Sequence, residues 1–328
     1  MQIQRLRSAR IALWAALVGG AGTALAGSAI GQDAFPSQTI NVITHAGPGG
    51  GTDITTRMMM LRGRPAFDQD MVVVSKTGGS GAASLQYLKS QECDGHSILT
   101  LTQSHVLQIA QGKVPVTIDE VVGLARATLD PQIITVRADS DIQSLDDLIA
   151  RSKETEGGLK WGTTFVGGAD HLAIHNFTKA AGGIPYTVVP FQGGGDIVTN
   201  LMGGDVQVGI LNFAEGESQF TNGDFRAIAV LASERVASLP DAPTAKEQGV
   251  DAEEHTVRGF ITLSCVPEER LQVLEEGLLK AMNHGIYQNY IESSGMPGNS
   301  VAGRDEWTAQ IRQIHDESQA ALKDLGML

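Results

Sequence analysis

Short apolar runs rich in β-branched residues alternate with longer amphipathic stretches along most of the chain. Strands regularly followed by helices of about 10–18 residues are typical of crossover connections, so the pattern predicts an α/β fold with parallel sheets. The predicted strands are Thr39–Thr44, Met71–Ser75, Ser97–Thr102, Ile133–Arg137, Lys160–Gly162, Thr187–Pro190, Val206–Leu211, Ala227–Ala232 and Val257–Leu263. The predicted helices are Asp53–Arg62, Ala82–Ser90, Ser144–Lys153, Asp170–Ala181, Asp196–Met202, Pro267–Asn283 and Arg304–Asp324.

The length of 328 residues exceeds what a single hydrophobic core usually serves. The segments near Ala125–Pro131 and Glu254–Gly259 have no strong loop signature, yet they bracket a complete α/β set. A lobe made of both chain ends, around an inserted second lobe, explains this pattern. We therefore predict lobe 1 over residues 27–127 plus 259–328, lobe 2 over residues 128–258, and a hinge at these two segments.

The first residues have the pattern of an export signal. Arg5, Arg7 and Arg10 precede an apolar run, and Ala24-Leu25-Ala26 matches a small-residue cleavage site. A membrane anchor is disfavoured because glycines interrupt an apolar stretch that is too short to span comfortably. We expect residues 1–26 to be a cleaved signal peptide and the mature protein to reside in the periplasm.

The charge of the chain limits its partners. The formal net charge is −13, and loss of residues 1–26, which hold three arginines and no acidic residue, makes it −16. A chain this acidic, without runs of Lys or Arg, is a poor binder of nucleic acid or anionic membranes. An anionic ligand would have to be attracted locally, because the overall field repels it.

The chain contains two cysteines, Cys93 and Cys265. In an oxidising compartment they can pair, or they can remain two separate buried thiols. The sequence leaves both possibilities open.

Glycine-rich turns stand where predicted strands meet predicted helices: Gly47–Asp53, Gly78–Gly81, Gly162–Asp170 and Gly193–Asp196. In open α/β sheets, ligands bind beyond the carboxyl ends of the strands. Glycines there let backbone N–H groups approach an anion, and the start of a helix adds positive partial charge. One such loop is usually a plain turn, but several at equivalent places favour a site that holds a carboxylate with backbone donors.

Other site chemistries find less support in the sequence. The first glycine loop matches neither a dinucleotide fingerprint nor a phosphate loop, so we expect no nucleotide cofactor. His171 and His175 share a helix face, but they lack the glutamate and further ligands of a zinc site, so we expect structural roles and no bound metal. Ser80, Ser84 and Ser104 lie outside any G-x-S-x-G motif, so we expect no catalytic residue and no enzyme.

The ordered set of motifs resembles one family, the periplasmic solute-binding receptors of tripartite tricarboxylate transporters, also called Bug or Tct receptors. The resemblance covers nearly the whole mature chain, and it is the order and spacing of the motifs that make it specific. The motifs are "FPSQTINVI", "PGGGTDITTR", "KTGGSGAASLQYL", "CDGHSILTL", "GTTFVGGADHLAIHNF", "VVPFQGGGDIVTNLMGGDVQVGI" and "RAIAVLASERVASLPDAPTAKEQGV".

The resemblance implies a two-lobed, venus-flytrap fold of the type II-like periplasmic-binding-protein class, without catalysis or cofactor. A small organic carboxylate (a di- or tricarboxylate or an aromatic acid) would lie between the lobes, held by backbone amides of two strand-to-helix loops. The receptor would act as a monomer and deliver the ligand to integral membrane transporter subunits. There are two alternatives to a transport receptor: a receptor that signals to a sensor kinase, and an exported hydrolase.

Carried onto this sequence, the resemblance implies a ligand-binding set in the two main loops, the neighbouring Gly-Ser turn and one acidic position. The set is His45, Ala46, Pro48, Gly49, Gly50, Gly51, Thr52, Asp53, Gly79, Ser80, Thr163, Thr164, Phe165, Gly167, Gly168, Ala169, Asp170, His171 and Asp205. Within it, Asp53 is expected to cap its helix rather than to touch an anion.

The chain departs from the family pattern at the walls of the expected site. Phe165 stands where the second loop usually has glycine, Gly168 replaces a serine, Ala46 replaces an aromatic residue, and His45 replaces a residue that is commonly proline. One hypothesis is that the site takes a bulkier or aromatic carboxylate; ordinary core packing of Phe165 is the alternative. Alanine substitution of Phe165 tests the hypothesis, which fails if every ligand keeps its affinity.

Overall fold

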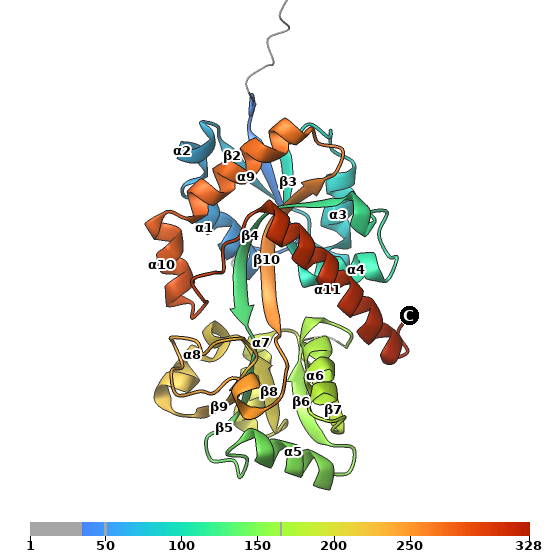
Figure 1. The fold of residues 1–328 in the computed structure, drawn as a ribbon, viewed down its shortest axis with the longest axis vertical. Coiled ribbons are helices and arrows are strands. Elements are labelled where there is room, and N and C mark those ends of the chain that lie inside the picture. Colours follow the sequence, from blue (N-terminus) through green and yellow to red (C-terminus); the bar gives the residue numbers. More distant parts are fainter. Residues whose placement is uncertain (1–34, 49–50, 165) are drawn as a thin grey trace, which may run out of the picture. The chain divides into compact units, whose positions relative to one another are not determined.

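Among the described residues, the strands form two separate five-stranded sheets, one in each of two lobes (Figure 1). This computed structural model describes residues 35–328 except 49–50 and 165. The predicted signal peptide, Gly49, Gly50 and Phe165 lie outside the described residues. Residues Phe35–Leu328 form one compact unit. The predicted two-lobed α/β fold is confirmed.

The sheet of lobe 1 has the strand order β2-β1-β3-β10-β4. β1 runs parallel to β2 and β3, whereas β10 is antiparallel to β3 and β4. Every residue of the central strand β3 is buried, because helices cover both faces of the sheet. The strands are β1 (Ile40–Thr44), β2 (Met71–Ser75), β3 (Ser97–Thr102), β4 (Val121–Pro131) and β10 (His255–Leu263).

The sheet of lobe 2 has the order β7-β6-β8-β5-β9. β6 is parallel to β7 and β8, and β5 is antiparallel to β8 and β9. The strands are β5 (Ile133–Arg137), β6 (Leu159–Thr163), β7 (Tyr186–Pro190), β8 (Val208–Leu211) and β9 (Phe225–Val230). The prediction of wholly parallel sheets is therefore wrong. Three strands of each sheet follow it, but β5 and β10 enter their sheets from the other lobe rather than through a crossover helix.

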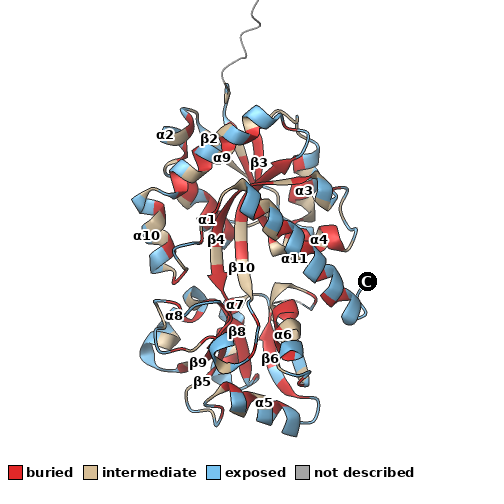
Figure 2. Cartoon of the chain, viewed as in Figure 1, coloured by how far each residue is buried: buried red, intermediate tan, exposed pale blue. Residues whose placement is uncertain are grey.

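The helices bury one face against a sheet or a neighbouring helix and expose the other (Figure 2). In lobe 1 they are α1 (Gly51–Met60), α2 (Gly63–Phe67), α3 (Ala82–Lys89), α4 (Gln103–Ala110), α9 (Glu268–Met282), α10 (Gly285–Ser293) and α11 (Arg304–Asp324), with short 3₁₀ turns η1 (Gly79–Gly81) and η2 (Ile118–Glu120). In lobe 2 they are α5 (Leu145–Glu154), α6 (Ala169–Ala180), α7 (Gly194–Gly203) and α8 (Phe213–Asn222), with η3 (Lys246–Gln248).

Each lobe has its own apolar core. In lobe 1, Phe260 of β10 and Leu274 of α9 are fully buried in one cluster. In lobe 2, Trp161 of β6 packs with Phe177 of α6, and neither side chain is exposed. Separate cores make it possible for the lobes to move as units about the segments that join them.

The chain crosses between the lobes at two adjacent places. Gln132 alone separates β4 from β5, and its backbone N–H donates to the carbonyl of Glu254, which immediately precedes β10. The N–H of Leu231, just after β9, donates to the carbonyl of Gln132. The two crossings are thus hydrogen-bonded to each other, within or next to the segments predicted as the hinge. The proposed lobe boundaries at residues 127/128 and 258/259 fall inside the long strands β4 and β10.

Two further links hold the fold. Leu322 of α11 is fully buried in a cluster with Leu172 of α6, so the C-terminal helix of lobe 1 also contacts lobe 2. Cys93 and Cys265 form a disulfide with a Cα–Cα distance of 5.8 Å, which ties the segment after α3 to the end of β10. The sequence left open whether the two cysteines pair or remain separate thiols, and the structure shows that they pair.

Candidate functional site

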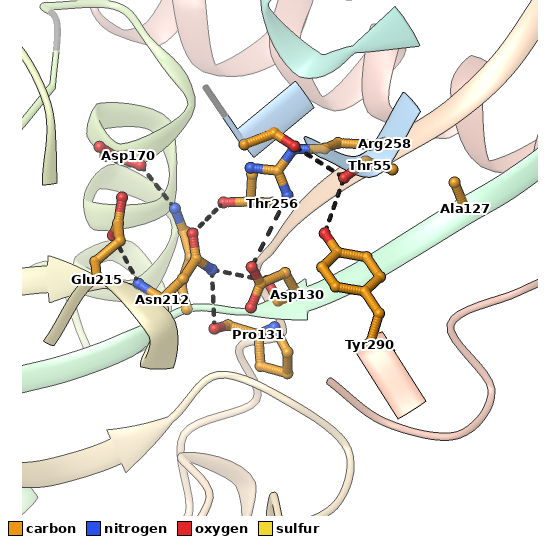
Figure 3. Close-up of polar contacts among 12 residues, drawn as sticks. Thr55, Ala127, Asp130, Pro131, Asp170, Asn212, Glu215, Thr256, Arg258 and Tyr290 are labelled. Carbon is orange, nitrogen blue, oxygen red and sulfur yellow. Dashed lines mark hydrogen bonds and ion pairs between the residues drawn. The ribbon is translucent and has the colours of Figure 1, made fainter. Parts of the chain in front are cut away.

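Polar side chains gather where the two crossings meet the first turns of α1, α6 and α8 (Figure 3). We call this set the inter-lobe cluster. Its members are Thr55, Asp130, Gln132, Thr164, Asp170, Asn212, Glu215, Thr256, Arg258 and Tyr290. Both lobes contribute to it, as expected for a ligand site in a two-lobed binding fold.

Arg258 brings a positive charge into the cluster. It extends from β10 towards the start of α1, where a Cβ atom placed on Gly51 would lie 3.1 Å from its Nη2. A side chain at position 51 would therefore require the Arg258 guanidinium to move slightly away. The Arg258 side chain is 16% exposed, and its Nη1 is 3.9 Å from the Asp130 carboxylate. Its Nε is buried and has no hydrogen-bond partner among the described residues.

Asn212, the N-cap residue of α8, fixes the crossing strands in place. Its Nδ2 donates to the carbonyls of Asp130 (3.0 Å) and Pro131 (3.1 Å), and its Oδ1 accepts from the Thr256 hydroxyl at 3.0 Å. Its backbone N–H donates to the Glu215 carboxylate at 2.9 Å. One amide side chain thus joins lobe 2 to both crossings.

Asp130 is buried, and burial raises the pKa of its carboxyl to about 7. The positive charge of Arg258 lowers this pKa and the negative charge of Glu215 raises it. A charge-assisted hydrogen bond is about 2.7–2.9 Å long, so the 3.9 Å pair of Asp130 and Arg258 is not one. The two side chains face each other (Figure 3), and a hydrogen bond from the Asn212 side chain also lowers the pKa of the Asp130 carboxyl.

The second glycine loop holds a carboxylate of the chain itself. Asp170 Oδ2 accepts from the backbone N–H of Thr164 (3.0 Å) and from its hydroxyl (2.7 Å), and Oδ1 accepts from Gln132 Nε2 at 2.8 Å. The N–H of Gly167 donates to His171 Nδ1 at 2.8 Å. Donors that the sequence assigned to a ligand are bound internally in this conformation, so their role as ligand contacts stays a prediction.

The first glycine loop follows β1 and leads into α1. Ala46 N–H donates to the Thr44 hydroxyl at 3.1 Å, and Asp53, which is buried, pairs with Arg57 at 2.9 Å. The hydroxyl of Thr55 bonds to the carbonyl of Gly51 and to the hydroxyl of Tyr290 in α10. Of the remaining predicted residues in this loop, Thr52 is buried and Pro48 exposed.

His45 lies beside this loop. Its ring packs edge-on against His105, with ring centroids 4.5 Å apart. Burial, together with the nearby positive charge of Arg258, lowers the pKa of His45 to about 4. His45 is therefore neutral at physiological pH and leaves Arg258 as the cation next to α1.

The other predicted residues fall into two groups. Gly79 and Ser80 form η1, which follows β2 at the same sheet edge as the first loop, because Thr44 and Ser75 are partners in parallel strands. Gly168 is the N-cap of α6, and Thr163 is buried at the end of β6; Ala169 begins α6.

Asp205 does not lie near the other predicted ligand-binding residues. It is exposed and precedes β8, whereas the second loop follows β6. Because β6 and β8 are parallel, these positions lie at opposite edges of the sheet.

Ser84 has a histidine partner that the sequence did not reveal. Its Oγ lies 2.9 Å from His105 Nε2, and both residues are fully buried. However, His105 Nδ1 accepts from the N–H of Thr102 at 3.0 Å, so the ring proton is on Nε2, and His105 donates to Ser84. The pair cannot deprotonate the serine, and it serves to join α3 to α4.

Arg258, Asp130, Asn212 and Tyr290 were not singled out in the sequence. The one available signal was Arg258 itself, a charged residue between Val257 and Gly259 in an otherwise apolar strand. A charge in a buried strand needs a partner. The sequence does not show that this partner lies in β4.

Among the described residues (35–328 without 49–50 and 165), no group of three or more His, Cys, Asp or Glu side chains could hold a metal ion. In the same residues, no helix is long and apolar enough to cross a membrane.

Comparison with known proteins places the chain. The model of the tripartite tricarboxylate transporter family receptor matches residues 56–325. Protein BugT of Bordetella pertussis is 26% identical over 224 residues, covering 67% of this chain and 68% of BugT. A TctC solute-binding protein from Polaromonas, solved without ligand, is 25% identical with a TM-score of 0.79, covering 88% of this chain and 99% of that one.

MatC from Rhodopseudomonas palustris, solved with bound malate, shares the fold at 18% identity and a TM-score of 0.70, covering 88% of this chain and all of MatC. The family model spans most of the chain, and the related structures share the two-lobed fold described above. The protein therefore belongs to the family of tripartite tricarboxylate transporter receptors.

Proposed function

We propose that this protein captures a small organic carboxylate between its lobes in the periplasm and delivers it to a tripartite tricarboxylate-type membrane transporter. The observation that carries the proposal is the meeting of Arg258 with the start of α1 at Gly51. A guanidinium and the positive end of a helix repel each other, and an anion bound between them relieves that repulsion. The protein has a net negative charge, so this local concentration of positive charge is informative.

Lobe closure would supply the binding mechanism. A carboxylate that contacts α1 and Arg258 on one side, and residues of lobe 2 on the other, binds the closed arrangement better than the open one. The ligand thereby shifts the population towards the closed state. Removal of the ligand from water strengthens each hydrogen bond to it.

The site and the family support different parts of the proposal. The family is one of transporter receptors, and a member of the same fold is described with bound malate, which supports a dicarboxylate as the first ligand to test. The membrane subunits and the export signal are proposed from the family and from residues 1–26.

A thermal-shift screen tests the carboxylate. Purified protein is heated with succinate, malate, citrate and benzoate, each beside its neutral amide. A ligand at 100 times its dissociation constant stabilises the folded state by about 2.7 kcal/mol, so a binder raises the melting temperature. We expect at least one acid, and not its amide, to do so. Stabilisation by neutral sugars or amides alone would contradict the proposal.

Delivery is tested separately. Membrane subunits of a tripartite tricarboxylate-type transporter are reconstituted in vesicles, and uptake of the labelled acid is measured with and without the protein. We expect uptake to require the protein. Uptake that is equal in its absence would contradict the transport role while leaving carboxylate binding intact.

A further inference from the structure

The two long strands that join the lobes, β4 and β10, pair irregularly beside the inter-lobe cluster. Arg258 of β10 lies opposite Thr128 of β4. The next residue of β10, Gly259, lies opposite Arg126, so Ala127 has no partner in the ladder. A β-bulge of this kind interrupts the regular hydrogen bonding and bends the strand that carries it. The bulge therefore places a point of bending next to Arg258.

Lobe 1 holds its side of the bulge through the side chain of Arg126. The guanidinium donates to the carbonyls of Ser300 (2.9 Å) and Asn299 (2.7 Å) and to Gln310 Oε1 (2.7 Å), and it pairs with Glu306 at 2.9 Å. All four partners lie in α11 or in the segment that leads into it. The Arg126 side chain is only 5% exposed, so water competes little for these bonds. Arg126 thus fixes β4 to the C-terminal helix of lobe 1.

The residues next to the bulge are fixed to lobe 1 as well. A Cβ atom on Gly259 would lie 2.5 Å from the ring of Trp307, which is fully buried. The carbonyl of Ala127 accepts from the hydroxyl of Tyr287 at 2.9 Å. A second irregularity of the ladder, after Phe260, lies deeper in lobe 1, in its apolar core. We therefore assign β4 up to Ala127, and β10 from Gly259 onwards, to lobe 1.

Lobe 2 holds the other side through Asn212, which comes from the start of α8. Its Nδ2 donates to the carbonyls of Asp130 and Pro131, the last two residues of β4. Its Oδ1 accepts from the hydroxyl of Thr256, the second residue of β10 (Figure 3). Asn212 is buried, so these bonds are also sheltered from water. We therefore assign β4 from Asp130 onwards, and β10 up to Thr256, to lobe 2.

Two rungs of the ladder remain between these two sets of contacts. They are the facing pairs Thr128 with Arg258 and Leu129 with Val257. Thr128 Oγ1 and Arg258 Nε are buried and have no hydrogen-bond partner among the described residues. Val257 packs against the core of lobe 1 by apolar contacts, which tolerate small shifts better than directional bonds do. The two rungs are thus the part of the connection that is held least firmly.

We propose that Arg126 and Asn212 are positioning residues for lobe closure, which confine the bending of the connection to the two rungs that include Arg258. Because Arg258 lies at the bend, a ligand that binds its guanidinium acts where the lobes rotate against each other. Loss of either residue lengthens the free part of β4, so the lobes then adopt a wider range of angles. This inference goes beyond the proposed function, and its test needs no ligand.

The test measures the distance between two nitroxide labels, one on each lobe, by pulsed electron paramagnetic resonance. The labels are attached to the variants Lys113→Cys, after α4, and Lys153→Cys, in α5, which replace two exposed side chains. Cys93 and Cys265 are paired with each other, so they do not take up the label. The width of the distance distribution in the ligand-free protein reports the range of angles between the lobes.

Asn212→Ser releases the lobe 2 side but keeps a residue type that caps a helix well. The free part of β4 then grows from two residues to four, because Asp130 and Pro131 are no longer held. Independent fluctuations add in variance, so we expect the variance of the distance to increase about twofold. Arg126→Gln releases the lobe 1 side and should widen the distribution as well.

Two matched controls make the same chemical changes elsewhere in lobe 2. Asn200→Ser and Arg226→Gln each remove a side chain that donates to backbone carbonyls, in α7 and in β9, away from the two rungs. We expect both controls to keep the wild-type width. Circular dichroism confirms that each variant is folded, and its melting temperature is recorded beside the distance distribution.

A folded Asn212→Ser protein with the wild-type width overturns the proposal, even if its melting temperature is lower, because Asn212 would then serve stability alone. Equal widening in the control variants overturns it too. If Arg126→Gln does not fold, Asn212→Ser decides by itself. The thermal-shift screen is read separately: if the distribution widens as expected but no acid binds, the assignment of Arg126 and Asn212 stands and carboxylate capture is wrong.

Discussion

Lobe 1 and lobe 2 place similar glycine-rich loops at the carboxyl ends of parallel strands, but the helices that follow meet opposite charges. The start of α1 in lobe 1 lies beside the guanidinium of Arg258. In lobe 2, Asp170 takes the donors of Thr164 ahead of α6, and the Glu215 carboxylate covers Gly194 at the start of α7. Glycines let backbone donors approach a ligand, whereas charged side chains of β10, α6 and α8 decide the charge that a ligand meets there.

Lobe 1 contains a disulfide whose two cysteines both lie in that lobe, and we expect its removal to change the free energy of unfolding more than any other substitution considered below. The disulfide between Cys93 and Cys265 joins only elements of lobe 1, and it spans a sequence separation of 172 residues. Loss of a cross-link over such a loop costs about 5 kcal/mol in the chain-entropy model. We expect Cys93→Ser with Cys265→Ser to lower the free energy of unfolding by about 3–5 kcal/mol in a urea titration.

The tryptophans report on the two lobes separately. Beyond the predicted signal peptide, Trp161 lies in lobe 2 and Trp307 in lobe 1, and both are fully buried. Single-tryptophan versions of the double-serine variant, made with Trp161→Phe or Trp307→Phe, therefore follow each lobe by fluorescence. We expect the lobe 1 signal to shift to lower urea than the lobe 2 signal. If the transitions of both tryptophans shifted to lower urea by the same amount, the disulfide would stabilise the two lobes as one unit.

The next effect concerns the charge balance between the lobes. Burial raises the pKa of Asp130 from its ordinary value of 3.8 to about 7 in the folded protein, despite the opposing charge of Arg258. The folded state therefore binds more protons than the unfolded state between about pH 4 and 7, so stability falls as pH rises through this range. One such group contributes a slope of up to about 1.4 kcal/mol per pH unit.

Asp130→Asn isolates this contribution. Urea unfolding at pH 5, 6, 7 and 8 should show that wild-type stability, relative to the variant, declines from pH 5 to 7 and then levels off. Acidic groups that do not interact with Asp130 act in both proteins and cancel in the difference, whereas Glu215, whose charge raises the pKa of Asp130, adds its coupling with Asp130 to the measured value. A difference that does not change with pH would mean that Arg258 keeps the Asp130 carboxyl ionised at all of these pH values.

The sequence predicts the lobes better than it predicts the charges of the site. Alternating strand and helix patterns place every predicted strand within about two residues, because those patterns arise from local burial. β4 was missed because small and polar residues such as Gly123 and Arg126 interrupt its apolar pattern. The glycine loops were found, but the pairing of Arg258 with Asp130 depends on the register of β10 against β4, which a single sequence does not encode locally. Asp205 was included from the family resemblance, although it precedes a predicted strand and the glycine loops follow strands.

Thr164 tests the lobe 2 side of the comparison. Its hydroxyl donates to Asp170 in the structure, whereas the sequence assigned it to a ligand. We expect Thr164→Val to lower the free energy of unfolding by about 1 kcal/mol and to leave carboxylate affinity within about threefold. Thr199→Val is the matched control, since Thr199 donates to a backbone carbonyl on the exposed side of α7. A tenfold loss of affinity for Thr164→Val alone would restore Thr164 to the ligand site.

The smallest effect is expected where the lobes touch through exposed charges. Lys179 of α6 pairs with Asp324 of α11 at 2.5 Å, but both side chains are well exposed. Exposed pairs gain little, because water and salt screen the attraction and two flexible side chains must be ordered. The apolar contact of Leu172 with the fully buried Leu322 therefore carries this link between lobes.

We expect Lys179→Ala to leave the melting temperature and the ligand affinity unchanged within error at both low and high salt. In contrast, we expect Leu322→Ala to lower the free energy of unfolding by about 2–5 kcal/mol. A salt-dependent gain in affinity for Lys179→Ala would instead show that the ion pair holds the lobes open against the ligand.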